Sequence, residues 1–384
     1  MAYRLKVLTP IHIHNGEKLN PMEYIARDKE VLIFDQMDVI KSIKENELLN
    51  DELLNSYAFT SKRSEYHKNL DYYIDKGIID ESIVDNYKTK AINKASGLDG
   101  KEIYRTMRNI KGTYIPGSSI KGVIRTAILY DYICKKGIDY LKNGINFLRK
   151  NRNLEIDDYI IFFTNTKNKA GKNIQGDPFK FLIIRDVNLM ENKVVIYNET
   201  IYNINKFISG NVIEAIGPGD YTEGFQLMNN LDEGNIDLFK KKIDTLYRKI
   251  DFNIDLVDYF NEKEILRVLY EFSKDIIDDE IEYFKVQNNQ FFNSKEVIEA
   301  LEEIKEKNSM DSPVIRLGKG KGYKSNTLAL AIKKLDKNYY NKEIKNIARP
   351  YKYRQQYEFP KTRNFVGSSL APKLLGFTIL EKVD

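Results

Sequence analysis

Apolar residues recur along this chain with two different periods, which predicts a mixture of strands and helices. Residues 3–8 alternate between apolar and polar positions up to Thr9-Pro10, and residues 11–14 alternate again, which is typical of half-buried strands. Apolar segments at 22–26 and 31–34 flank a charged turn and predict a β-hairpin. The predicted strands cover residues 3–8, 11–14, 22–26, 31–34, 103–108, 179–184, 193–197, 212–216, 225–228 and 375–380, with 16–21 as a loop.

The segment 119–135 has a clear helical period. Its apolar positions begin at Ile120 and continue at i+3, i+4, i+7 and i+8. Ser118 or Ser119 is a natural N-cap for this helix. Helical patterns also cover residues 35–49, much of the Tyr-rich insertion 50–95, 231–306 and 326–335.

Strands interleaved with helices predict an α+β fold with mainly antiparallel sheets and helical insertions. We divide the chain into an N-terminal part, 1–210, with the helical insertion near 50–95, and a C-terminal part, 211–384. The second part holds an acidic helical region, 231–306, and a basic glycine-rich loop, 316–325. The two parts are either sequential or intertwined, since the last strand is able to complete the first sheet.

Composition narrows the class of protein. The 384 residues are 42% hydrophobic and 30% charged, which is ordinary for a globular protein with a sizeable core. No apolar run approaches the ~20 residues of a transmembrane helix, so we expect no membrane span. The single cysteine, Cys134, excludes an internal disulfide and a cysteine-based zinc cluster. We expect a cytoplasmic protein.

Charge is segregated along the chain. Residues 313–363 carry fourteen Lys or Arg against three acids, a net charge of +11, whereas the whole chain has only +5. A basic surface with glycine-rich loops suits a polyphosphate ligand, most plausibly RNA. Residues 231–306 carry twenty acids against eleven bases, a net charge of −9. We expect this acidic region to face solvent or another protein, away from RNA.

Two glycine segments are candidate phosphate sites. Gly117–Gly122 precedes the clear helix, where the first backbone amides are unsatisfied and attract anions. Lys121 and Arg125 share one face of that helix, and residues 101–125 carry six bases against one acid. The alternative is an ordinary capped helix with a solvated basic face.

The second segment, Gly318–Ser325, alternates three glycines with lysines and is able to wrap a phosphodiester backbone. Its spacing matches neither a Walker A loop nor a dinucleotide fingerprint. The alternative is a mobile surface loop. A basic turn at 359–365 with Lys361 and Arg363 is suited to further backbone contacts.

His12 and His14 alternate on a predicted strand and therefore face the same side. Together with Lys121 they have the groups needed for metal-independent RNA cleavage by general acid–base transfer. The alternative is that they are structural or contact phosphate. We expect no metal site, because no set of carboxylates has recognisable ligand spacing, and we expect no cofactor.

The order of three motifs resembles the RAMP superfamily of CRISPR proteins. The first strand runs into Thr9–Gly16, then comes Tyr114–Arg125 with its Ile-Pro-Gly-Ser-Ser-Ile-Lys-Gly run, and the late glycine loop precedes the last strand. The Ile315–Gly318 lead-in and the Pro360–Arg363 turn look most like the fifth-subunit family of type III-A Csm effector complexes.

This resemblance implies ferredoxin-like, RRM-related modules and a subunit that caps the 3′ end of the CRISPR RNA (crRNA). It implies binding to the 3′ region of the guide through its backbone, support for guide maturation and complex assembly in antiviral defence, and no catalysis. The implied partners are crRNA, the neighbouring backbone RAMP subunits of the Csm complex and host nucleases that trim the 3′ end, with no membrane.

We therefore predict an RNA-binding assembly subunit. The alternatives are a metal-independent CRISPR endoribonuclease that uses His12 or His14, and a protein adaptor that binds no RNA. The predicted RNA-contacting residues are His14, Arg105, Arg108, Gly117, Ser118, Ser119, Lys121, Arg125, Lys319, Lys321, Lys324, Lys361 and Arg363.

Overall fold

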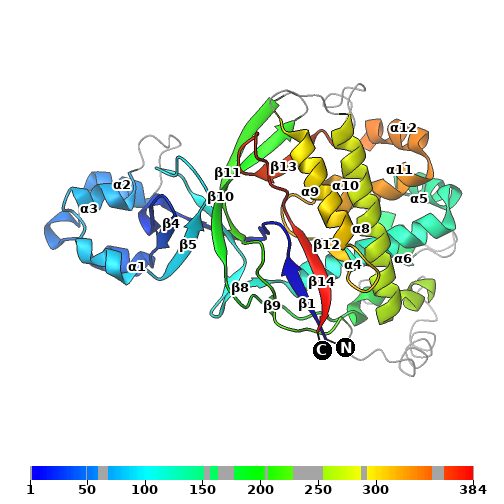
Figure 1. Ribbon diagram of the computed structural model, residues 1–384, viewed down its shortest axis with the longest axis horizontal. Helices are drawn as coiled ribbons and strands as arrows, with labels where there is room; N and C mark the ends of the chain where they lie inside the picture. The colour runs from blue at the N-terminus through cyan, green and yellow to red at the C-terminus, as the bar shows by residue number, and fades with distance from the viewer. Residues whose placement is uncertain are drawn as a thin grey trace.

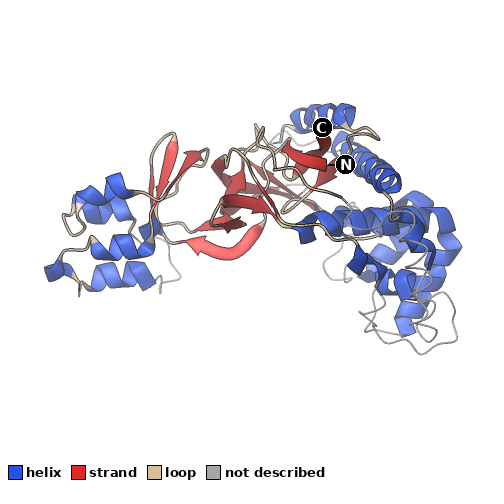
Figure 2. Ribbon diagram, turned by 90° about the horizontal axis from the view of Figure 1, so that it is seen from below, coloured by secondary structure: helices blue, strands red, loops and turns tan. Residues whose placement is uncertain are grey.

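Helices and strands form three regions in the computed structural model. A small lobe with helices α1–α3 lies at one end, a curved sheet lies in the middle, and a layer of longer helices lies at the other end (Figures 1 and 2). The structure describes residues 2–48, 50–58, 68–150, 156–162, 177–203, 206–227, 254–286, 292–347 and 359–383.

The middle region is built on an eight-stranded sheet with the order β2-β6-β11-β10-β5-β4-β3, in which β13 also pairs with β10. Most neighbours are antiparallel, and only β10–β5 and β11–β6 are parallel. The predicted α+β class with mainly antiparallel sheets is thus confirmed. The strands are β2 (His14–Leu19), β3 (Tyr24–Ala26), β4 (Glu30–Ile33), β5 (Thr89–Asn93), β6 (Ile103–Thr106), β10 (Val194–Asn203), β11 (Lys206–Ile216) and β13 (Thr362–Val366).

A second sheet joins the two ends of the chain. Its central strand β14 (Phe377–Val383) lies between β1 (Ala2–Val7) and β12 (Val314–Arg316), and Ala2 pairs directly with Val383. A third, small sheet contains β7 (Arg108–Asn109), β8 (Gly112–Ile115) and β9 (Val187–Asn188). The last strand therefore does pair with the first. Strand β11 runs across position 210, and the division at that position stays a prediction.

The helical layer is centred on α4 (Gly117–Lys136) and α8 (Glu262–Lys285), which pack against each other. All five apolar positions that define the helical period of α4 are buried in the largest core cluster. The other helices of this layer are α5 (Ile138–Lys150), α6 (Ile156–Phe162), η7 (Ile254–Tyr259), α9 (Ser294–Lys307), α10 (Tyr323–Asn326), α11 (Ala329–Leu335) and α12 (Lys337–Ile347).

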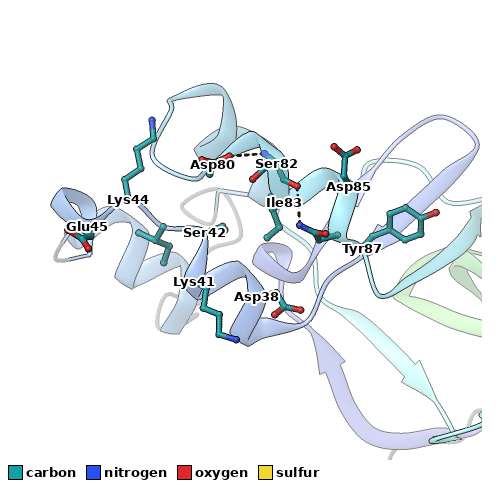
Figure 3. Close-up of a pocket in the computed structure, with 12 residues that line it drawn as sticks. Asp38, Lys41, Ser42, Lys44, Glu45, Asp80, Ser82, Ile83, Asp85 and Tyr87 are labelled. Carbon is teal, nitrogen blue, oxygen red and sulfur yellow. Dashed lines mark hydrogen bonds between the residues drawn. The ribbon is translucent and has the colours of Figure 1, made fainter.

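The lobe has a core of its own. Met22, Phe34 and Tyr73 belong to a buried cluster that is separate from the main core. A polar depression opens on this lobe between α1 and the 81–86 turn, and Figure 3 shows the side chains of Asp38, Lys41 and Lys44 along its margin. The lobe elements are η1 (Pro21–Glu23), α1 (Gln36–Lys41), η2 (Glu45–Glu47), α2 (Asp51–Ala58), α3 (Leu70–Asp75) and η4 (Glu81–Asn86).

Several predicted boundaries are wrong, and each has a local cause. Residues 16–19 extend strand β2 instead of forming a loop, because Lys18 and Leu19 pair with Tyr104 and Ile103 of β6 after an irregularity in the register. The helix from Asp35 ends at Lys41. Segment 179–184 begins in a 3-10 helix, η6 (Pro178–Phe181), because Asp177 caps it and proline follows. Residue Phe225 forms only a bridge to Tyr3.

The predicted hairpin at 22–34 is confirmed by the β3–β4 pairing. Within 231–306, residues 254–286 and 292–306 are described and mostly helical, as predicted, and the remainder lies outside the described residues. No helix in the described part of the chain is long and apolar enough to cross a membrane.

Candidate nucleic-acid interface

The glycine loop packs directly on the His12–His14 segment. The amide of Lys319 donates to the His12 carbonyl oxygen at 2.8 Å. Gly318 has a φ of +67°, and a Cβ there would lie 2.3 Å from the same oxygen. Gly320 also approaches a neighbour closely, since its Cβ would lie 2.7 Å from the Leu375 Cβ. Glycine is thus required here for contacts within the chain.

The two histidines lie on the same side, as predicted. Their ring centroids are 5.8 Å apart with an interplanar angle of 26°. His12 is buried and its Nδ1 lies 2.7 Å from the carbonyl oxygen of Glu214. Burial lowers the pKa of His12 to about 4, so the ring is neutral at pH 7. His14 is exposed.

A buried carboxylate holds the two arginines predicted upstream of α4. Glu214 accepts a hydrogen bond from Arg108, and its Oε2 lies 3.8 Å from Arg105 Nε. The Thr106 amide donates to Glu214 at 3.0 Å. Burial raises the pKa of Glu214, and the two guanidinium groups oppose this shift. Both arginine side chains are 19% exposed, so they keep some access to solvent.

The tip of α4 differs from its prediction. The helix begins at Gly117 with Pro116 as N-cap, so neither Ser118 nor Ser119 caps it. The Gly117 amide, expected to be unsatisfied, donates to Asp186 Oδ1 at 2.8 Å. A Cβ at Gly117 would lie 2.0 Å from the Ile184 carbonyl oxygen. This glycine therefore allows close packing, and a protein carboxylate already occupies the anion position.

The cations of α4 also have neighbours within the chain. Arg125 donates to Asp177 at 2.6 Å and to Asp157 at 3.1 Å. Burial lowers the pKa of Arg125, but these two carboxylates outweigh it and raise the pKa overall. Lys121 is half-buried, and burial lowers its pKa despite the charge of Asp177. The local charge around the helix tip is therefore largely balanced.

Much of the basic tract is paired with the acidic helix α8. Lys324 is buried and donates to both oxygens of Asp279, at 2.9 and 2.6 Å, and Lys333 donates to the same carboxylate at 2.5 Å. Arg363 is buried and donates through Nε to Glu280 at 2.8 and 3.0 Å. The expectation that the acidic region faces solvent or another protein is wrong for this part of α8, because its carboxylates neutralise lysines and arginines of the same chain.

A buried arginine that the sequence did not single out lies beneath the loop. Arg316 Nε donates to the Leu375 carbonyl oxygen at 3.1 Å, and its guanidinium lies 4.5 Å from the centroid of the Phe377 ring. Its NH1 is 4.0 Å from Glu280, which also holds Arg363. Two buried arginines thus share one carboxylate, which leaves excess positive charge behind the loop.

Lys321 is the loop cation most available to a ligand. It is half-buried, and among the described residues none lies within ion-pair distance of its ammonium group. Burial and the charge of Arg316 lower its pKa. Lys319 is bound to buried Glu199 at 2.8 Å. A phosphate near Lys321 would gain from the positive charge of Arg316.

The structure adds Tyr104, which the sequence did not distinguish from the other tyrosines. It lies on β6 with its ring centroid 5.3 Å from that of His14, and Lys18 Nζ is 4.7 Å from its centroid. It packs against a cluster containing Leu375, over which Gly320 lies. The alternation on β6, with Ile103 fully buried, was the available signal. We call His14, Lys18, Tyr104, Lys319 and Lys321 the loop face.

The predicted residues therefore separate into groups. The loop of Lys319 and Lys321 packs on the segment that holds His14, and Arg105 and Arg108 lie beside that segment on Glu214. Gly117, Ser118, Ser119, Lys121 and Arg125 belong to the α4 tip, whose neighbours are residues 184–186 and two aspartates. Lys324 and Arg363 are buried in ion pairs, and the carbonyl of Lys361 accepts from Tyr283.

The loop is connected to helix α4 through α10, which follows the loop directly and contacts α4. Across the described ranges, no group of three or more His, Cys, Asp or Glu residues is arranged to hold a metal ion.

The amino-acid sequence of this chain is similar to those of two Csm5 proteins. A curated Csm5 protein of Methanocaldococcus jannaschii is 26% identical over 362 residues, which cover 90% of this chain and 77% of that protein. A Csm5 protein of Streptococcus thermophilus is 27% identical over 139 residues, 33% of this chain and 38% of the relative.

Two solved structures share the fold. A chain of a type III-A Csm–crRNA–target RNA ternary complex superposes with a TM-score of 0.72 at 21% identity, covering 99% of this chain and 100% of that one. The crystal structure of T. onnurineus Csm5 gives a TM-score of 0.62 at 20% identity, covering 98% and 99%. The family model of the RAMP superfamily matches residues 4–323, and the chain therefore belongs to the RAMP superfamily.

Proposed function

We propose that this chain is the Csm5-type subunit of a type III-A CRISPR effector complex and binds the 3′ region of crRNA through backbone contacts. In this role it supports guide maturation and complex assembly without cleaving RNA itself. The similarity to curated Csm5 proteins over most of the chain supports the assignment, as does the shared fold with a chain of a Csm–crRNA–target RNA complex.

The observation that carries RNA binding is the packing of the glycine loop on the His12–His14 segment. This packing joins the loop that carries Lys319 and Lys321 to the segment of His14, whose ring lies beside the partly exposed ring of Tyr104. Single-stranded nucleic acids are bound by this combination of a basic track and aromatic side chains. Backbone contacts of this kind carry little sequence specificity.

The contacting residues that we retain are those with solvent access. Lys321 is the primary phosphate contact, and His14 borders the RNA strand. The Lys319 side chain is 29% exposed, so it can contact a phosphate while it stays paired with Glu199. Arg105 and Arg108 extend the track. Lys324 and Arg363 are left out because their side chains are themselves buried, at 5% and 3% exposed, so neither reaches RNA without breaking its buried ion pair.

The test is affinity of the full chain for a single-stranded RNA of ~30 nucleotides, measured by fluorescence anisotropy over a range of salt concentrations. Each phosphate contact contributes about 0.7 to the log–log salt slope for single strands. Lys321→Glu should weaken binding and reduce the slope by about that amount. Lys41→Glu, an exposed charge reversal on the distant lobe, is the matched control (Figure 3).

RNA binding is contradicted if the wild type binds only in the non-specific range and Lys321→Glu changes nothing. In that case the protein-adaptor alternative stands. Co-purification from the host would identify the neighbouring backbone subunits and any nuclease that trims the guide.

The endoribonuclease alternative has its own test. Buried His12, whose Nδ1 is held by the Glu214 carbonyl, is poorly placed to reach a substrate proton, which leaves His14 as the candidate base. Purified protein is incubated with labelled repeat RNA in EDTA. Site-specific cleavage that disappears in His14→Ala would replace our assignment with this one.

A further inference from the structure

We propose that Tyr104, supported by His14, is a stacking platform for one nucleobase of the bound RNA strand. The inference rests on the proposed function and adds to it a residue and a mode of contact. Its basis is a row of rings that ends at the protein surface next to the glycine loop.

The row begins in the core and runs outward. Buried His12 lies 5.8 Å from His14 between ring centroids, with the rings nearly parallel at 26°. His14 in turn lies 5.3 Å from Tyr104 at an angle of 46°. Because His12 is fixed by its hydrogen bond to the Glu214 carbonyl, it limits the movement of the two outer rings. A preorganised aromatic surface loses little conformational entropy when a base stacks on it.

Lys18 occupies the place over the tyrosine ring that a base would take. Its ammonium lies 4.7 Å from the ring centroid and 2.8 Å from the carboxylate of Glu102. The Lys18–Glu102 pair is solvent-accessible, and ion pairs of this kind are weak because water screens them. A base can therefore displace Lys18 at low cost, and the freed ammonium is within reach of the phosphate that follows.

The platform and the loop lie on the same side of the eight-stranded sheet. Tyr104 packs on the cluster that contains Leu375 and Val366, and Gly320 of the loop lies against Leu375. Lys319 is joined to His12 by its backbone amide. An RNA strand whose phosphates lie along Lys319 and Lys321 would therefore direct one of its bases toward Tyr104. Stacking is tolerant of base identity, because every base has a π face.

The test uses RNA with 2-aminopurine scanned along the strand, together with RNA that carries a single abasic site at each position. With wild-type protein we expect quenching of 2-aminopurine at one position, and weaker binding when that position is abasic. Stacking on an aromatic side chain contributes about 1–3 kcal/mol per base, so Tyr104→Ala should weaken binding by roughly 5- to 150-fold. Tyr104→Phe should bind like the wild type.

Two further variants keep the test informative. Tyr104→Leu keeps apolar bulk under the Leu375 cluster without a π face, and it should lose the quenching even if Tyr104→Ala is poorly folded. Tyr87→Ala removes an exposed tyrosine of the lobe and should change neither readout. Unchanged affinity and quenching in Tyr104→Leu, with the wild type still binding RNA, overturns the platform and leaves the proposed function standing. Failure of the wild type to bind RNA would overturn both.

Discussion

The α4 tip and the glycine loop look alike in sequence but differ in the structure. Both combine glycines with closely spaced cations, as phosphate-binding segments do. At the tip, Asp186 accepts from the Gly117 amide, and two aspartates hold Arg125. At the loop, Lys321 lies near buried Arg316, which shares Glu280 with Arg363.

The difference shows what a local motif is able to specify. A glycine reports that the backbone is approached closely, but the approaching group at both sites is another part of the same chain, Ile184 or His12. A cation in such a motif indicates that a negative charge lies nearby. The sequence does not show whether that charge belongs to a ligand or to the protein itself. The two regions therefore differ in the groups that contact their glycines and cations. Substituting those groups tests the difference.

The largest effect is expected from Arg363, a predicted RNA contact that is buried against Glu280. Arg363→Ala leaves a buried carboxylate without its main partner and should lower the free energy of unfolding by about 3–5 kcal/mol. Chemical denaturation measures this loss. The exposed pair of Lys88 with Asp35 is the control, and Lys88→Ala should cost much less stability than Arg363→Ala. Similar losses in the two variants would contradict the distinction between buried and exposed pairs.

The histidine beneath the loop should make stability depend on pH. Its pKa in the folded protein is about 4, below the ordinary value of 6.5, so between these values the unfolded chain binds a proton that the native protein does not. His12 thus contributes stability above pH 6.5 that is lost as pH falls toward 4, about 2 kcal/mol at pH 5.

Denaturation of the wild type and His12→Asn at pH 7 and pH 5 measures this contribution. The variant should lose less stability than the wild type between the two pH values. Equal losses would mean that His12 is accessible to protons in the folded protein.

Alanine substitutions at Gly117 and Gly318 should distinguish a role in packing within the chain from a role in RNA binding. Gly117→Ala and Gly318→Ala each force a Cβ onto a backbone oxygen, and each should cost about 1–3 kcal/mol of stability. Only Gly318→Ala should also weaken RNA binding by the folded protein, because it displaces the loop from His12. Gly122→Ala, at an open helical position, should stabilise by about 0.5–1 kcal/mol. Weaker RNA binding in Gly117→Ala than in Gly318→Ala would reverse our assignment.

Among the variants at the two sites, the smallest loss of stability is expected from Asp186 at the helix tip. Asp186→Ala removes the acceptor of the Gly117 amide and should cost about 1 kcal/mol of stability, as for other lost helix caps. RNA affinity should stay constant. A clear increase in RNA affinity would show that the freed amide binds phosphate and that the tip is the stronger of the two sites.

Elements with strong periodicity were predictable from the sequence. The buried stripe of α4 and the β3–β4 hairpin follow from patterns within a single element. The capping of η6 by Asp177 was missed because a short apolar run does not distinguish a strand from a 3-10 turn. Patterns within a single element do not show which distant segments of the chain pair with each other.

The same limit explains the site. The alternation of His12 and His14 placed both rings on one side, and the loop was identified as basic and glycine-rich. The ion pairs of Lys324 with Asp279 and of Arg363 with Glu280 join residues far apart in the chain. Tyr104 could not be selected from 26 tyrosines until β6 was placed beside His14 and the loop.

The pairing of Ala2 with Val383 has a practical consequence for engineering. The two ends of the chain lie side by side (Figure 1), so a short linker could join them and new termini could be opened in the lobe. Such a circular permutant would keep every strand of the β1-β14-β12 sheet. Affinity tags would then be attached in the lobe and not beside that sheet. The permutant would also reverse the order in which the two paired strands are synthesised, because β1 precedes β14 in the present chain and would follow it after permutation.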